Sequence, residues 1–144
     1  MSTTCPIKNS QALESFKDYY MTVKPNIRNY AMIILGLNTA FRIGDLLQLK
    51  WKDVYREKEA GFREHISVME QKTGKERVVA VNTAVRKVLV QFRENTAELF
   101  SEDFLFPSQK NHKQPISRYQ AYRIIREAAA HTELEEHISC QSLR

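Results

Sequence analysis

Hydrophobic side chains recur at the three- and four-residue spacing of an α-helix in four parts of the chain. These apolar positions are Leu13, Phe16, Tyr19 and Tyr20, then Tyr30, Ile33, Ile34 and Leu37, then Val85, Val88, Leu89 and Phe92, and finally Tyr122, Ile125 and Ala129. Pro25 has no backbone N–H and therefore separates the first two helices. The second helix is apolar over most of its surface, which predicts a place at the centre of the core.

Residues that favour helix N-termini precede three of these four stretches, namely Asn9 or Ser10, Asn82 or Thr83, and Ser117. The second helix is expected to break at Thr39–Arg42. A short amphipathic turn of helix follows from Gly44 to Leu49. Trp51 and Val54 are expected to close this hydrophobic unit.

A period of two replaces the helical spacing in the middle of the chain. His65–Glu70 alternates polar and apolar residues, and Val78–Val81 is rich in β-branched residues. The glycine-containing turn Lys72–Lys75 lies between them, so the pair predicts an antiparallel β-hairpin. The charged segment Arg56–Arg63 predicts an exposed connection before this hairpin.

The last third of the chain adds a short extended piece, Phe104–Pro107, and a polar, basic loop, Ser108–Pro115. Together the elements predict an α+β fold that is mainly α-helical with a small antiparallel β-sheet. With 144 residues and 42% hydrophobic side chains, the sequence predicts a single domain over residues 1–144.

Charge and cysteine usage narrow the class of protein. The chain has 22 Lys and Arg against 17 Asp and Glu, a net charge of +5 that suits a polyanionic partner without requiring one. Cys5 and Cys140 lie at opposite ends and the four histidines are scattered, so we expect reduced thiols and no metal site. No basic leader or long apolar run predicts export or a membrane span, which favours a cytoplasmic protein.

Arg42 follows the most apolar helix and precedes a second apolar segment. A guanidinium buried there needs an anion, because an unpaired buried charge is costly. The commonplace explanation is an ion pair with Asp45, three residues along the chain. The functional alternative is that Asp45 orients Arg42 while the free side of the guanidinium binds an external phosphate.

Two further basic segments suit phosphate groups. The hairpin tip carries Lys72 and Lys75 with Arg77 beyond them, which is either a solvated turn or a β-finger that enters a DNA groove. The loop with Lys113 leads to a capped helix start at Arg118, which would offer backbone N–H groups and a guanidinium to a phosphate. A plain surface loop explains the second segment equally well.

Taken in order, five segments resemble motifs of the tyrosine recombinases, the phage integrase family. They are Ala40–Val54 for the first arginine motif, Lys72–Val81 for the catalytic-lysine hairpin, Phe104–Pro107 and Pro115–Ile125 for the next segment, and Ile138–Arg144 for the H-x-x-R motif. The resemblance covers nearly the whole chain. It implies the family's catalytic fold, a double-stranded DNA substrate, and a reaction that needs no metal or nucleotide cofactor.

The resemblance also implies roles for single residues. Arg42 and Arg144 correspond to the two arginines that clamp the scissile phosphate and offset its developing charge. Lys72 corresponds to the general acid that protonates the departing 5′ oxygen, with Lys75 as the second choice. In the family a tyrosine attacks the phosphate and forms a 3′-phosphotyrosine link.

The sequence departs from the family pattern in two ways. Gln141 stands where the family has a histidine, and an amide donates hydrogen bonds but cannot shuttle protons. The nucleophile of the family follows the second arginine, whereas all six tyrosines here precede Arg144. We therefore expect a partial catalytic domain without the N-terminal DNA-clamping domain or the nucleophile segment, inactive by itself. Such a chain is either a fragment or an unusually short recombinase.

Three hypotheses follow. The first is a DNA breaking-and-joining enzyme that acts in site-specific recombination or integration, monomeric in solution and assembling with other protomers on DNA. The second is a non-catalytic DNA-binding remnant or regulator, which Gln141 favours. The third is a helical protein-interaction module, which leaves Arg42 and Lys72 unexplained and predicts binding that is insensitive to salt.

Overall fold

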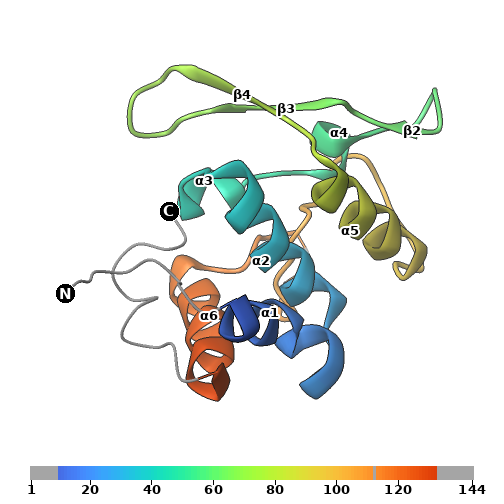
Figure 1. Cartoon of the computed structure of the whole chain (residues 1–144). Helices are drawn as coiled ribbons and strands as arrows, with labels where there is room; N and C mark the ends of the chain where they lie inside the picture. The colour runs from blue at the N-terminus through green and yellow to red at the C-terminus, as the bar shows by residue number, and fades with distance from the viewer. Residues whose placement is uncertain (1–9, 112, 133–144) are drawn as a thin grey trace.

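A helical body lies under a β-hairpin that runs across its upper side (Figure 1). The computed structural model describes residues 10–111 and 113–132. Its four longer α-helices are α1 (Ser10–Asp18), α2 (Ile27–Thr39), α5 (Thr83–Glu94) and α6 (Arg118–Thr132). The predicted fold class, mainly helical with small antiparallel sheets, is confirmed.

Helix α2 is the central element of the core, as its apolar surface predicts. Five consecutive residues from Ala31 to Leu35 are buried, so the helix is covered on every side. Asn26 caps it by accepting a hydrogen bond from the backbone N–H of Asn29 at 3.1 Å. Ala40 ends it in the left-handed conformation, with φ of 58°, which turns the chain sharply toward Arg42.

The first helix differs from the prediction in its last turn. Helix α1 continues into a π-helical turn, η1 (Tyr19–Val23), which ends before Pro25. Tyr19 and Tyr20 both become buried there. The Tyr20 hydroxyl donates to the carbonyl oxygen of Ile124 at 2.6 Å and so joins this turn to α6. Its phenol is therefore a core group with a satisfied polar end.

Two very short helices, α3 (Ile43–Leu46) and α4 (Trp51–Val54), connect the body to the sheets. The charged segment predicted as an exposed connection is exposed at residues 56–60, and it forms a small hairpin of β1 (Tyr55–Arg56) and β2 (Gly61–Phe62). The Tyr55 ring packs against that of Phe62, with centroids 4.9 Å apart. This pair explains why the charged segment folds back on itself.

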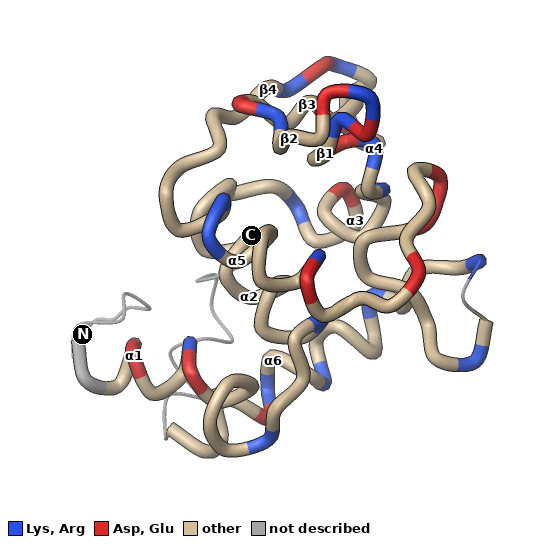
Figure 2. Tube along the Cα trace, turned by 90° about the vertical axis from the view of Figure 1, so that its right-hand side faces the viewer, with Lys and Arg blue, Asp and Glu red and all other residues tan. Residues whose placement is uncertain are grey.

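The predicted long hairpin is present as β3 (His65–Met69) and β4 (Glu76–Ala80), paired antiparallel with His65 opposite Ala80. Ile66 and Val68 point into the core while the alternate residues are exposed, as a period of two requires. Both signs of charge occur along the β1–β4 region (Figure 2). The hairpin therefore has a buried face toward the helices and an outer face that mixes polar residues with the exposed Met69 and Val78.

The segment after α5 returns the chain to the centre of the molecule. Asn82 caps α5 through the N–H of Val85 at 2.9 Å, as expected. The extended piece predicted at 104–107 bonds on both sides, since Leu105 N–H donates to the Leu49 carbonyl and Ile116 N–H donates to the Phe106 carbonyl. These bonds fix the start of α6 beside α3.

Candidate functional site

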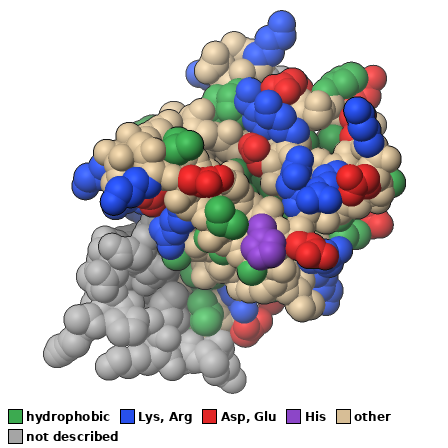
Figure 3. Space-filling model, turned by 90° about the horizontal axis from the view of Figure 1, so that it is seen from above, with side chains coloured by type: hydrophobic (Ala, Val, Ile, Leu, Met, Phe, Trp, Pro, Cys, Tyr) green, Lys and Arg blue, Asp and Glu red, His purple; other side chains and the backbone are tan. Residues whose placement is uncertain are grey.

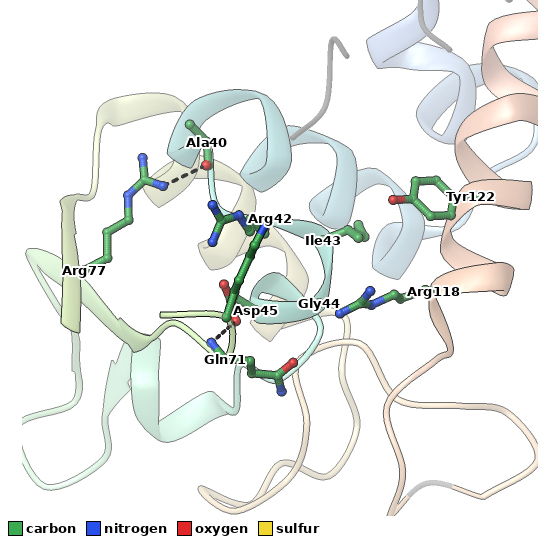
Figure 4. Close-up of a pocket in the computed structure, with 10 residues that line it drawn as sticks. Ala40, Arg42, Ile43, Gly44, Asp45, Gln71, Arg77, Arg118 and Tyr122 are labelled. Atoms are coloured by element: carbon green, nitrogen blue, oxygen red, sulfur yellow. Dashed lines mark hydrogen bonds between the residues drawn. The ribbon is translucent and has the colours of Figure 1, made fainter. Parts of the chain in front are cut away.

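A cavity of about 770 Å³ opens where three distant parts of the chain meet (Figure 4). The parts are the α2–α3 junction, the β3–β4 turn with the start of β4, and the first turns of α6. The residues that line it are Ala40, Arg42, Ile43, Gly44, Asp45, Gln71, Lys72, Arg77, Arg118 and Tyr122. Four of the cations predicted to contact DNA, Arg42, Lys72, Arg77 and Arg118, are thus brought into one cavity.

The cavity is strongly cationic. Its lining holds Arg42, Lys72, Arg77 and Arg118 against a single carboxylate, Asp45. Arg77 is partly neutralised, because its Nη1 lies 3.7 Å from a Glu70 carboxylate oxygen and donates to the Ala40 carbonyl at 3.2 Å. Within residues 10–111 and 113–132, no ion pair engages the other three cations. The site is therefore suited to an anion that arrives from outside.

Asp45 contacts a different partner from the one predicted. No ion pair joins it to Arg42 in the part of the chain that the structure describes. Instead its Oδ1 accepts a hydrogen bond from the backbone N–H of Gln71 at 3.1 Å, and the side chain is 5% exposed. Asp45 therefore ties α3 to the β-hairpin immediately before Lys72. The residue that it orients is in the lysine turn and not in the arginine motif.

Arg42 itself is exposed, contrary to the expectation of a guanidinium enclosed by apolar helices. It stands at the N-cap position of α3 in an extended conformation, between buried Phe41 and half-buried Ile43. This geometry directs the apolar neighbours inward and the guanidinium into the cavity (Figure 4). Because water reaches it, Arg42 needs no internal carboxylate.

The hairpin turn presents Lys72 to the cavity and Lys75 away from it. Gly74 has φ of 72°, and its N–H donates to the Glu70 carbonyl at 2.8 Å. The Glu70 side chain accepts from the Thr73 hydroxyl at 2.9 Å, which closes the turn further. Lys75 is exposed and does not line the cavity. Of the two lysines that the sequence offered, the geometry favours Lys72.

Helix α6 supplies the opposite wall. Ser117 caps it through the N–H of Gln120 at 3.0 Å, as predicted, and Arg118 begins its first turn. Tyr122 lies one turn later and also lines the cavity, with its hydroxyl toward the interior of the cavity (Figure 4). By its spacing Tyr122 belongs to the apolar stripe of the helix, but it is 45% exposed. The i, i+4 spacing from Arg118 is the sequence signal that could have identified Tyr122.

The remaining predicted residues lie elsewhere. Lys113 is exposed in the loop before α6, where its N–H donates to the Asn111 side chain, and it does not line the cavity. Gln141 and Arg144 lie outside the described residues. Four of the tyrosines, Tyr19, Tyr20, Tyr30 and Tyr55, are buried or half-buried, and burial raises the pKa of Tyr20 and of Tyr30.

The outer surface indicates a binding site less clearly than the cavity does. Acidic and basic side chains are mixed over the face that carries the hairpin (Figure 3). No described helix is both long enough and apolar enough to cross a bilayer. Within the described residues, no three His, Cys, Asp or Glu side chains gather as a metal site would require. The unbalanced positive charge inside the cavity is therefore the most distinctive chemical feature.

Solved structures with a similar fold include two recombinases and an integrase. XerA recombinase superposes with a TM-score of 0.67 at 20% identity, over 94% of this chain and 45% of that chain. XerH site-specific recombinase bound to its difH substrate gives 0.62 at 22% identity, over 92% and 39%. The lambda integrase catalytic core gives 0.63 at 15% identity, over 91% and 77%. The chain spans less than half of the XerA and XerH chains, and the likeness defines its fold as that of tyrosine recombinases.

Proteins with similar sequences are also integrases and recombinases. The model of the phage integrase family matches residues 8–144. A probable integrase/recombinase, YoeC of Bacillus subtilis (strain 168), is 36% identical over 139 residues, which are 96% of this chain and 70% of YoeC. The chain therefore belongs to the phage integrase family, and the resemblance stated from its motifs is confirmed.

Proposed function

We propose that this protein acts in site-specific DNA recombination and that its cationic cavity binds a phosphate of double-stranded DNA. The observation that carries the proposal is the convergence of Arg42, Lys72 and Arg118 from three separate segments, with no carboxylate partner among the described residues. A planar guanidinium suits a phosphate because it donates parallel hydrogen bonds to two oxygens. Membership of the phage integrase family supports the same substrate.

The chemistry we propose follows from these residue types. Arg42, together with Arg144 in the H-x-x-R segment, would offset negative charge as the phosphate becomes pentacoordinate. Lys72 would donate a proton to the departing 5′ oxygen, which an arginine cannot do because it keeps its proton. A tyrosine oxygen would form the new bond to phosphorus as the bond to the 5′ oxygen breaks, and its own proton would pass to solvent; we expect this tyrosine to be none of the six in this chain. Attack by a 5′ hydroxyl on this link would rejoin the strand, returning the proton to Lys72.

Gln141 supports a second candidate, a DNA-binding regulator that occupies recombination sites without cutting. The amide replaces a proton-transferring histidine and can only hydrogen-bond to a phosphate oxygen. In either case we expect a monomer in solution that meets other recombinase protomers on DNA. The cytoplasm remains the place that the composition favours.

The experiment that tests DNA binding measures the affinity of the chain for a labelled duplex at several salt concentrations. Affinity should fall steeply with salt, because each phosphate contact releases counterions and contributes about 0.9 to the slope of log affinity against log salt. Arg42→Ala and Lys72→Ala should each weaken binding. Lys58→Ala removes one charge from an exposed turn outside the cavity and is the matched control. Undetectable binding at low salt would refute the proposal.

A further inference from the structure

Gly44 is buried in α3, directly beneath the guanidinium of Arg118. A Cβ atom at position 44 would lie 2.5 Å from Nη2 of Arg118 and 3.1 Å from its Cζ and Nε. The first of these distances is shorter than two such atoms tolerate, so a side chain there would displace the arginine. The guanidinium of Arg118 can therefore lie where it does only because residue 44 has no side chain.

The backbone at Gly44 does not itself require glycine. Among the described glycines, only Gly74 has a positive φ, so Gly44 has a conformation that any residue adopts in a helix. Glycine also weakens a helix relative to alanine. Local structure alone would thus favour alanine at position 44. The reason for glycine is that it leaves room for the close approach of Arg118.

Arg118 and Tyr122 form a donor pair on one face of α6. They are four residues apart, which places them one above the other on the helix. Both line the cavity, and Tyr122 is 45% exposed. In the described part of the chain no hydrogen bond engages the hydroxyl of Tyr122 and no ion pair engages Arg118. Both side chains can therefore donate to an anion.

We propose that Gly44 is a positioning residue that admits Arg118 into the cavity, where Arg118 and Tyr122 bind a DNA backbone phosphate opposite the hairpin. This inference rests on the proposed function, because it takes duplex DNA as the ligand. It adds a second wall to the site, so that the phosphate backbone is held by α6 as well as by Arg42 and Lys72. The hydroxyl and the guanidinium act as hydrogen-bond donors only, and no bond is made or broken by them.

The test is a double-mutant cycle on the complete 144-residue chain, read by binding to a labelled duplex over a range of salt. Arg118→Ala should weaken binding about tenfold, the usual scale of a charge-assisted hydrogen bond, and should lower the salt slope by about 0.9. Gly44→Ala should weaken binding in the wild-type background and leave it unchanged in the Arg118→Ala background. Tyr122→Phe should weaken binding severalfold without changing the salt slope.

Matched variants on the same helix serve as controls. Arg126→Ala removes an exposed guanidinium, and Tyr119→Phe removes the hydroxyl of a tyrosine that is 67% exposed, both outside the cavity. Arg126→Ala should change DNA affinity less than Arg118→Ala does, and Tyr119→Phe should change it less than Tyr122→Phe does. Gly44→Ala should also leave the unfolding midpoint at or above that of the wild type, since it improves helix propensity.

The outcomes separate this inference from the proposed function. If Gly44→Ala weakens binding equally in both backgrounds, or lowers the unfolding midpoint even without Arg118, position 44 acts through packing and the inference is wrong. It is also wrong if Arg118→Ala and Tyr122→Phe match their controls while Arg42→Ala and Lys72→Ala lose affinity, and the proposed function then stands. If the wild-type chain fails to bind duplex at low salt, both proposals are refuted.

Discussion

The Oδ1 atom of Asp45 lies 3.1 Å from the backbone nitrogen of Gln71 and accepts its hydrogen bond. This contact joins residues 26 positions apart. It fixes the hairpin turn relative to α3, and therefore Lys72 relative to Arg42. The two cations that we propose to act on one phosphate are thus set in place through a third, buried residue.

Removing this contact should affect stability and DNA binding together. We expect Asp45→Ala to lower the free energy of unfolding by about 1–3 kcal/mol, because the Gln71 N–H loses its acceptor. DNA affinity should fall as Lys72 loses its fixed place. Asp45→Asn keeps an oxygen acceptor, so its free energy of unfolding and its DNA affinity should both lie close to those of the wild type. Urea unfolding and duplex binding measure the two quantities. Equal loss in Asn and Ala would mean that the charge of Asp45 matters and not its acceptor.

The turn that carries Lys72 should be sensitive to its glycine for backbone reasons alone. A Cβ at Gly74 would meet nothing within 4 Å, yet φ there is 72°. Gly74→Ala should therefore cost about 1 kcal/mol of unfolding free energy from backbone strain. Gly61→Ala is the control, because its φ is not positive and its nearest atom would be an ordinary contact at 3.7 Å. A neutral Gly74→Ala would show that the turn rearranges without cost.

The ion pair at the far end of α6 should give a pH-dependent contribution to stability. Hydrogen bonds from Lys24 and Tyr19, at 2.9 and 2.8 Å, lower the pKa of Glu127 below its usual value. A lowered carboxyl pKa stabilises the fold above the unfolded-state value, about 4.3, and this contribution is lost as pH falls through the folded-state value. Glu127 is partly exposed, so the amount is at most about 1 kcal/mol.

Glu127→Gln measures that contribution directly. The variant should unfold at lower urea concentration than the wild type at neutral pH, and the two should converge as pH falls through the lowered pKa of Glu127. Glu98→Gln, an exposed carboxyl before the 104–107 segment, should show no such convergence. A constant difference between Glu127→Gln and the wild type at all pH values would contradict this account.

Covalent trapping tests the prediction that none of the six tyrosines is the nucleophile. Incubation of the chain with nicked duplex should give no protein–DNA adduct that survives denaturation. Tyr122 is the decisive case, because it lines the proposed phosphate site. A covalent adduct that mass spectrometry maps to Tyr122, and that Tyr122→Phe abolishes, would overturn the prediction.

Local sequence signals predicted the elements well, because they depend on neighbours in the chain. The caps at Asn82 and Ser117 and the alternation around Ile66 are satisfied within a few residues, so their patterns carry through to the structure. The first arginine and the lysine turn were found from motif resemblance, and the structure brings Arg42 and Lys72 into one cavity.

The contacts that were missed depend on distant parts of the chain. Asp45 was paired with the nearest cation in sequence, whereas its partner is a backbone N–H on another element. Tyr122 fits an apolar stripe by its spacing. In the structure α6 lies beside α3, and Tyr122 faces the cavity between them and not the core. The β1–β2 hairpin forms because Tyr55 and Phe62 pack together within a segment whose charges mask them.

Arg42, Lys72 and Arg118, which have no ion-pair partner within residues 10–111 and 113–132, also have a consequence for the protein without DNA. Charges of one sign repel each other more strongly beside a low-dielectric wall than in open water. The free protein therefore carries a local penalty, and an anion that binds only the native state would remove it and raise the melting temperature. Substitutions that remove one of these cations would then stabilise the protein without DNA and weaken its binding to DNA. The site would thus trade stability against activity.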